Sequence, residues 1–86
     1  MKSGNKIKIS QMVRKGANYV ELEMDSIRSV RDYLIRRDFV MDGSYQGEYF
    51  YEYYYEKEGV RYCLFGNWYM GEMAFRRVDE NSVDRT

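Results

Sequence analysis

The chain has 86 residues, with 14 basic and 14 acidic side chains and neither histidine nor proline. This length fits one domain over residues 1–86 and is too short for a deep cleft between two subdomains. The absence of histidine excludes an imidazole base and histidine metal ligands, and the single cysteine, Cys63, excludes an internal disulfide and the usual structural zinc sites.

The charges and the aromatic residues are unevenly distributed. Residues 1–37 carry nine basic and four acidic side chains, a net of +5, whereas residues 38–86 carry five and ten, a net of −5. Twelve of the fifteen aromatic residues fall between Tyr45 and Phe75. Such asymmetry indicates either an interaction surface or solvated faces that happen to segregate.

No apolar run approaches the roughly 18 residues that a membrane span needs, and the first residues do not resemble a secretory signal. Together with the single thiol, this predicts a cytoplasmic protein, in the host cytoplasm if the chain is encoded by a virus.

The first predicted elements form a hairpin. Residues 6–14 alternate partly between apolar and polar side chains, residues 16–18 form a turn, and residues 19–24 alternate cleanly. In an alternative interpretation, Ser10 caps a short helix that ends at Gly16. Residues 1–5 and 79–86 are polar and are expected to be frayed tails.

A helix is predicted from Asp25 or Ser26 to Arg37. Its apolar stripe contains Ile27, Val30, Leu34 and Ile35, with Arg28, Arg31 and Arg36 facing away. A turn at residues 42–43 follows.

From Tyr45 the sequence predicts a three-stranded meander, with a four-residue turn at 56–59 and a two-residue turn at Gly66-Asn67. The fold class is therefore α+β: a single helix packed on one face of an antiparallel sheet of four or five strands, in the order ββαβββ.

These turns set a register in which Tyr55 faces Val60 and Phe65 faces Trp68. One face of the meander is then almost uncharged and is predicted to be the core. It contains Tyr51, Tyr53, Tyr55, Val60, Tyr62, Leu64, Tyr69, Met73 and Phe75.

The opposite face is predicted to be open and to bind a partner. It carries Tyr54 stacked on Arg61, an Arg61–Glu72 ion pair, a row with Glu52, Cys63 and Met70, and a row of Phe50, Phe65 and Trp68. The predicted partner-binding residues are Phe50, Tyr54, Arg61, Phe65, Trp68, Met70 and Glu72. Two alternatives are that a terminal segment folds over this face, or that the register slips by one residue and exchanges the faces.

We find no pattern typical of an enzyme. The chain has no phosphate-binding glycine motif, Glu48, Glu52 and Glu56 are expected on an open solvated strand face, and Cys63 in mid-strand is expected to be an inert packed thiol. We therefore expect no catalytic residues, no cofactor and no metal.

The aromatic row with a charged rim predicts a small protein-binding module, an inhibitor or an adaptor, that binds another protein or itself as a homodimer. Its small size and lack of motifs suit a virus- or mobile-element-encoded inhibitor of a host enzyme or defence system.

The alternative function is binding of single-stranded nucleic acid. Bases would stack on the same sheet face, and Lys6, Lys8, Arg14 and Lys15 would hold phosphates. Acidic side chains around the aromatic row count against this alternative, because such binding depends on neutralising phosphates with Lys and Arg.

Overall fold

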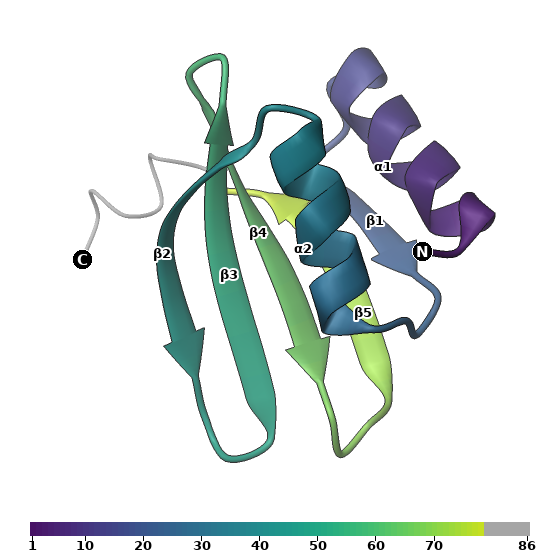
Figure 1. The fold of residues 1–86 in the computed structure, drawn as a ribbon, viewed down its shortest axis with the longest axis vertical. Helices are drawn as coiled ribbons and strands as arrows, with labels where there is room; N and C mark the ends of the chain where they lie inside the picture. Colours follow the sequence, from purple (N-terminus) through teal and green to yellow (C-terminus); the bar gives the residue numbers. More distant parts are fainter. Residues whose placement is uncertain (79–86) are drawn as a thin grey trace.

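In the computed structural model, which describes residues 1–78, two helices accompany one antiparallel five-stranded sheet (Figure 1). In chain order the elements are α1 Ser3–Lys15, β1 Tyr19–Leu22, α2 Ile27–Arg36, β2 Val40–Gln46, β3 Phe50–Lys57, β4 Val60–Asn67 and β5 Glu72–Arg77. The α+β class and the antiparallel sheet are confirmed. Helix α1 lies where a strand was predicted and a helix was only the alternative, so the predicted single helix and the order ββαβββ are only roughly matched.

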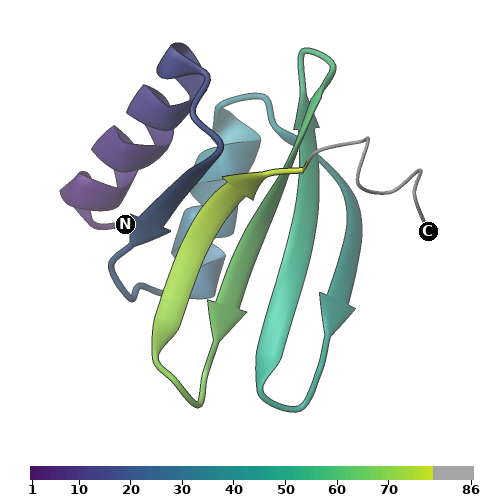
Figure 2. The ribbon, with the colours of Figure 1, turned by 180° about the vertical axis from the view of Figure 1, so that it is seen from behind.

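The sheet has the strand order β1-β5-β4-β3-β2, so β1 and β2 are its two edges. Helix α2 carries the chain from one edge to the other, and both helices lie on the same face of the sheet (Figures 1 and 2). Val30 and Leu34 of α2 are fully buried with Tyr55, Leu64 and Phe75 of the strands. We call the face of the sheet against which both helices lie the helix-covered face, and the opposite face the open face.

Residues 6–14 do not form a strand. They belong to α1, which buries Ile9 and Met12 and ends at Gly16 in the left-handed conformation, with a φ of 72°. The alternative interpretation placed the end of this helix correctly, but its N-cap, Ser10, lies eight residues beyond the observed N-cap, Lys2. Residues 1–5 are not a frayed tail, because α1 begins at Ser3; the predicted tail 79–86 lies outside the described residues.

Asn5 fastens α1 to the sheet. Its side chain is fully buried, its Nδ2 donates to the carbonyl oxygen of Glu23 at 2.9 Å, and its Oδ1 accepts from the backbone N–H of Glu23 at 2.8 Å. The side-chain amide thus pairs with backbone just beyond the end of β1, which satisfies buried polar groups of both elements.

Strand β2 was not predicted. Residues 42–43 are a bulge within it, where the pairing with β3 shifts between Met41 and Gly43, rather than a turn. The chain turns instead after Gln46. In α2, Ser26 is the N-cap as expected, but Ile35 is exposed rather than part of the buried stripe.

The predicted loop lengths of the meander are wrong. The two-residue loop is Glu58-Gly59, where both φ angles are positive, at 53° and 78°. The chain continues through Gly66-Asn67 in β4 and turns over four residues, 68–71.

The two faces are nevertheless largely correct. Tyr55 lies opposite Tyr62 rather than Val60, a shift of two residues. Phe65 lies opposite Ala74, six residues beyond its predicted partner Trp68. Because side chains alternate with period two, even shifts leave each strand residue on its face.

Within the described residues, neither helix has the length and apolar character that crossing a membrane requires.

We predict that Asn5→Ala lowers the free energy of unfolding by about 1–3 kcal/mol, since it leaves the N–H and C=O of Glu23 without a partner. Urea unfolding measures this, with Ile7→Ala, an exposed site on the same helix, as the matched control. Equal unfolding midpoints for the two variants would show that the amide does not fasten α1.

Candidate functional site

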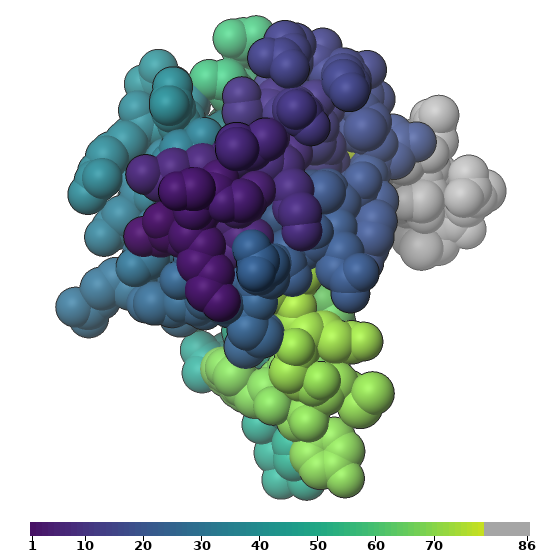
Figure 3. Space-filling model, turned by 90° about the vertical axis from the view of Figure 1, so that its right-hand side faces the viewer, coloured from purple at the N-terminus to yellow at the C-terminus, as the bar shows by residue number. Residues whose placement is uncertain are grey.

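Two surfaces formed by the strands are not covered by α1 or α2. One is the open face (Figure 2), and the other is the end of the sheet where the β2–β3 and β4–β5 hairpins turn. In the side view these hairpin ends extend beyond the body formed by the helices (Figure 3). Six of the twelve aromatic residues between Tyr45 and Phe75 gather there.

Three aromatic rings pack together on the open face close to this end. The ring centroids of Phe50 and Phe65 are 6.2 Å apart, and those of Tyr45 and Phe50 are 5.5 Å apart. Phe50 and Phe65 are half-buried and Tyr45 is exposed. The predicted proximity of Phe50 and Phe65 is confirmed, and their third neighbour is Tyr45.

Trp68 and Met70 do not lie on the open face as predicted. They belong to the 68–71 loop, and Trp68 turns toward the helix-covered side, where its ring lies 5.3 Å from that of Tyr51. The reason is the longer loop, which removes both residues from the strand register. Asn67 Oδ1 accepts from the N–H of Met70 at 2.9 Å and holds the loop in shape.

At the tip itself, the two loops contact each other. The N–H of Trp68 donates to the carbonyl oxygen of Tyr49 at 2.7 Å, and the rings of Tyr49 and Tyr69 lie 5.6 Å apart. Tyr69 was predicted to be in the core but is 80% exposed, the largest value among the large apolar side chains of residues 1–78.

These residues form a band that passes from the open face around the tip to the helix-covered side. We call it the aromatic end. It consists of Tyr45, Tyr49, Phe50, Phe65, Trp68, Tyr69 and Met70.

The Tyr51 ring, which contacts Trp68, lies over Gly66 on the neighbouring strand. A Cβ at Gly66 would overlap this ring. Glycine at this position therefore allows a large buried ring to pack against the backbone.

Arg61 is on the open face but at the far end of β4 from Glu72, so the predicted Arg61–Glu72 pair does not form. Glu72 lies opposite Asn67, and Arg61 instead pairs with Asp42 at 3.2 Å. The predicted stacking of Arg61 on Tyr54 is present, with the guanidinium 4.8 Å from the ring centroid.

A second charged network lies beside it. Glu52 accepts a hydrogen bond from Tyr54 Oη at 2.9 Å and pairs with Arg76 at 3.7 Å. Burial raises the pKa of Tyr54 to about 12, and the hydrogen bond to Glu52 acts in the same direction. Cys63 is fully buried although it belongs to the open face; burial raises the pKa of its thiol to about 11.

The open face also has a shallow hollow of about 310 Å³ next to Phe65 and Ala74. Glu21, Glu52 and Glu72 line it, with Arg76 as the basic residue. Among residues 1–78, neither Glu21 nor Glu72 forms an ion pair. The border of the aromatic end is therefore acidic.

The four basic residues proposed to hold phosphates lie on a different part of the molecule. Lys6, Lys8, Arg14 and Lys15 are all on α1, on the helix-covered side, and are separated by the sheet from the open-face rings (Figures 1 and 2). Among residues 1–78 no group of three metal-ligating side chains is found.

Sequence reasoning missed Tyr45, Tyr49 and Tyr69 as site residues. The signal for Tyr69 was the segment 67–71, in which an asparagine and a glycine bracket three large residues, as suits a wider loop.

No protein family, curated protein or solved structure matches this chain.

We predict that Gly66→Ala destabilises the fold by about 1–3 kcal/mol, because the Tyr51 ring must leave its place, and that it changes the fluorescence of Trp68, the single tryptophan. The control is Gly43→Ala, where an added Cβ meets ordinary contacts. In a Tyr51→Ala background the cost of Gly66→Ala should shrink; an unchanged cost would contradict this packing.

We also predict that Cys63 reacts with iodoacetamide at pH 8 at least about 100-fold more slowly in the folded protein than in urea, because a pKa raised from 9.0 to about 11 leaves little thiolate. A raised folded pKa also means that stability present below pH 9 is lost as the pH rises toward 11. Cys63→Ala should therefore lose less stability than the wild type between pH 8 and 10.5, by about 1–2 kcal/mol. Rapid labelling of the folded protein contradicts the prediction.

Proposed function

We propose that this chain is a non-catalytic protein-binding module, an inhibitor or an adaptor, and that the aromatic end is its contact surface. The observation that carries the proposal is the concentration of exposed Tyr45, Tyr49, Trp68, Tyr69 and Met70 on two adjoining loops and the neighbouring strand end. Exposed apolar patches of this kind mark interaction sites, and Trp and Tyr dominate the binding energy of interfaces.

The acidic border defines the chemistry of the partner. Glu21 and Glu72 line the hollow beside the aromatic end, and Glu48 is exposed in the 47–49 loop. A partner that joins apolar or aromatic side chains to Lys or Arg complements this surface. Phosphates of a nucleic acid would be repelled by the same carboxylates.

The charge pattern also argues against a symmetric homodimer through this surface. In a two-fold interface the same patch faces itself, so the carboxylates of both copies would approach one another. The repulsion weakens self-association and leaves the aromatic end accessible to a different protein.

The test is selection of displayed random peptides on immobilised protein. We expect selected peptides to combine Arg or Lys with aromatic residues and to bind Trp68→Ser/Tyr69→Ser about 30-fold more weakly than the wild type, as expected for two interface hot spots. The matched control is Ile35→Ser/Val40→Ser, two apolar residues of similar exposure away from the aromatic end; it should bind as the wild type does.

Equal binding of the selected peptides by both double variants would contradict the proposal, as would acidic peptides whose binding is lost in Trp68→Ser/Tyr69→Ser. Light scattering over a hundredfold dilution then measures the mass of the protein in solution. If the wild type is a dimer and Trp68→Ser/Tyr69→Ser is a monomer, the aromatic end serves self-association instead.

A further inference from the structure

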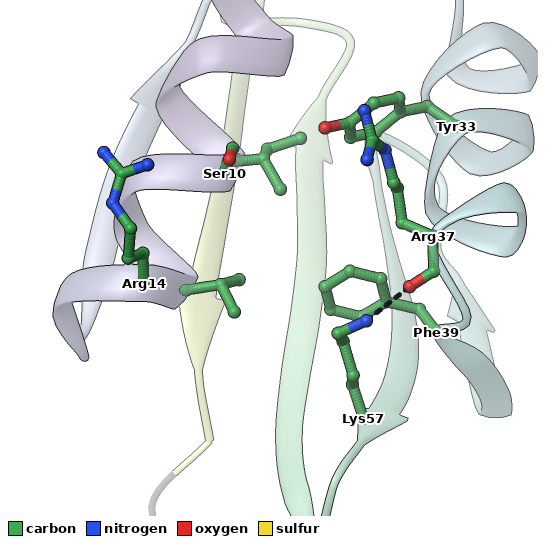
Figure 4. Close-up of a pocket in the computed structure, with 8 residues that line it drawn as sticks. Ser10, Arg14, Tyr33, Arg37, Phe39 and Lys57 are labelled. Atoms are coloured by element: carbon green, nitrogen blue, oxygen red, sulfur yellow. Dashed lines mark hydrogen bonds between the residues drawn. The ribbon is translucent and has the colours of Figure 1, made fainter.

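A groove runs between α1 and α2 (Figure 4). It lies beside the C-terminal end of α2, at the opposite end of the sheet from the β2–β3 and β4–β5 turns of the aromatic end (Figure 1). Its apolar lining comes from Ile9, Val13 and Phe39, and it encloses about 250 Å³. A second hollow of about 290 Å³ continues it along α1 toward Lys6. Ser10, which lies on α1, borders both hollows.

The charged side chains that line this groove within residues 1–78 are all basic. Lys6, Arg14, Arg37 and Lys57 line the two hollows, and no acidic residue among residues 1–78 does. The nearby C-terminal ends of α1 and α2 offset part of this charge, about half an elementary charge each. Lys57 caps α2 by donating to the carbonyl oxygen of Arg37 at 2.6 Å. Four cations still outweigh two helix ends, so the groove attracts anions.

The aromatic residues of the groove are not available to stack a nucleobase. Tyr33 is 8% exposed and Phe39 4% exposed. The guanidinium of Arg37 lies 5.4 Å from the Tyr33 ring, and Lys57 Nζ lies 5.3 Å from the Phe39 ring. Binding of single-stranded nucleic acid uses open aromatic platforms, and the groove offers cations above an apolar floor instead.

We propose that this groove binds an acidic segment of a partner protein. Carboxylates of the segment would pair with Lys6 near one end and with Arg14, Arg37 and Lys57 near the other. An apolar side chain between the carboxylates would contact Ile9, Val13 and Phe39. This proposal does not rest on the aromatic end, which presents the opposite charge at the other end of the sheet.

The test uses fluorescence anisotropy with the labelled peptide acetyl-EDELEDE at about 50 mM NaCl, a salt concentration that screens charges only partly. We expect Arg14→Glu/Arg37→Glu to weaken binding about tenfold or more, since two close charge pairs become repulsive. The control Lys15→Glu/Arg36→Glu makes the same charge change in the last turns of the same helices, at residues that do not line the groove. It should stay within about threefold of the wild type.

A second variant guards against misfolding. Ser10→Trp fills the groove from an exposed position without changing any charge, and it should also abolish binding. A peptide with glycine in place of its leucine should bind more weakly than the parent. Trp68→Ser/Tyr69→Ser should leave peptide binding unchanged, so that this site and the aromatic end can fail independently.

The proposal is overturned if the peptide does not bind at high micromolar protein, or if both charge-reversal variants weaken binding equally. It is also overturned if an oligothymidine of eight nucleotides binds more tightly than the peptide and loses affinity in Arg14→Glu/Arg37→Glu, which would assign the groove to nucleic acid.

Discussion

The architecture depends on a mismatch between the length of the helix and that of the strands it covers. Helix α2 has 10 residues, about 15 Å at 1.5 Å per residue, whereas β3 and β4 have eight residues each, about 26 Å at 3.3 Å per residue. The helices cover one face of the sheet and only part of its length. What remains uncovered is the open face and the strand ends, where Tyr51 and Trp68 shield each other across Gly66. The exposed aromatic residues therefore gather where the helix layer ends.

The meander shows which parts of a fold can be predicted from sequence. Alternation in β3 and β4 assigned Tyr51, Tyr55, Tyr62 and Leu64 to the core, and all four are buried. Alternation does not define which turn is tight, so the pairing was displaced while the faces were preserved. The strand prediction for residues 6–14 was wrong for a related reason. Ile7, Ile9 and Val13 fit one face of a strand, but Asn5, Ile9 and Met12 fit one side of a helix. The Asn5 amide favours the helix by pairing with the backbone of Glu23, which is far away in the sequence.

The sequence placed residues correctly on the open face only where they lie within predicted strands. Phe50, Phe65, Tyr54 and Arg61 are on the open face as expected, since strand parity alone places them there. The position of Trp68 depends on loop length, and that of Arg61 relative to Asp42 depends on β2, a strand interrupted by a bulge. Loop conformation and β-bulges are local features of the backbone, and the alternation of apolar and polar residues does not predict them.

The fold places the basic and the acidic residues of the two halves of the sequence on different surfaces. The helices come from the basic half and bring Lys6, Arg14 and Arg37 to the groove. Arg14 and Arg37 lie at the C-terminal ends of α1 and α2, where the helix dipole favours cations. The acidic half supplies the hairpins, and with them most of the carboxylates that border the aromatic end. An inhibitor that blocks one target needs a single contact surface. The two proposed surfaces carry opposite charges at opposite ends of one sheet, so two partners would bind there without steric conflict. We therefore propose an adaptor that bridges a basic partner and an acidic one.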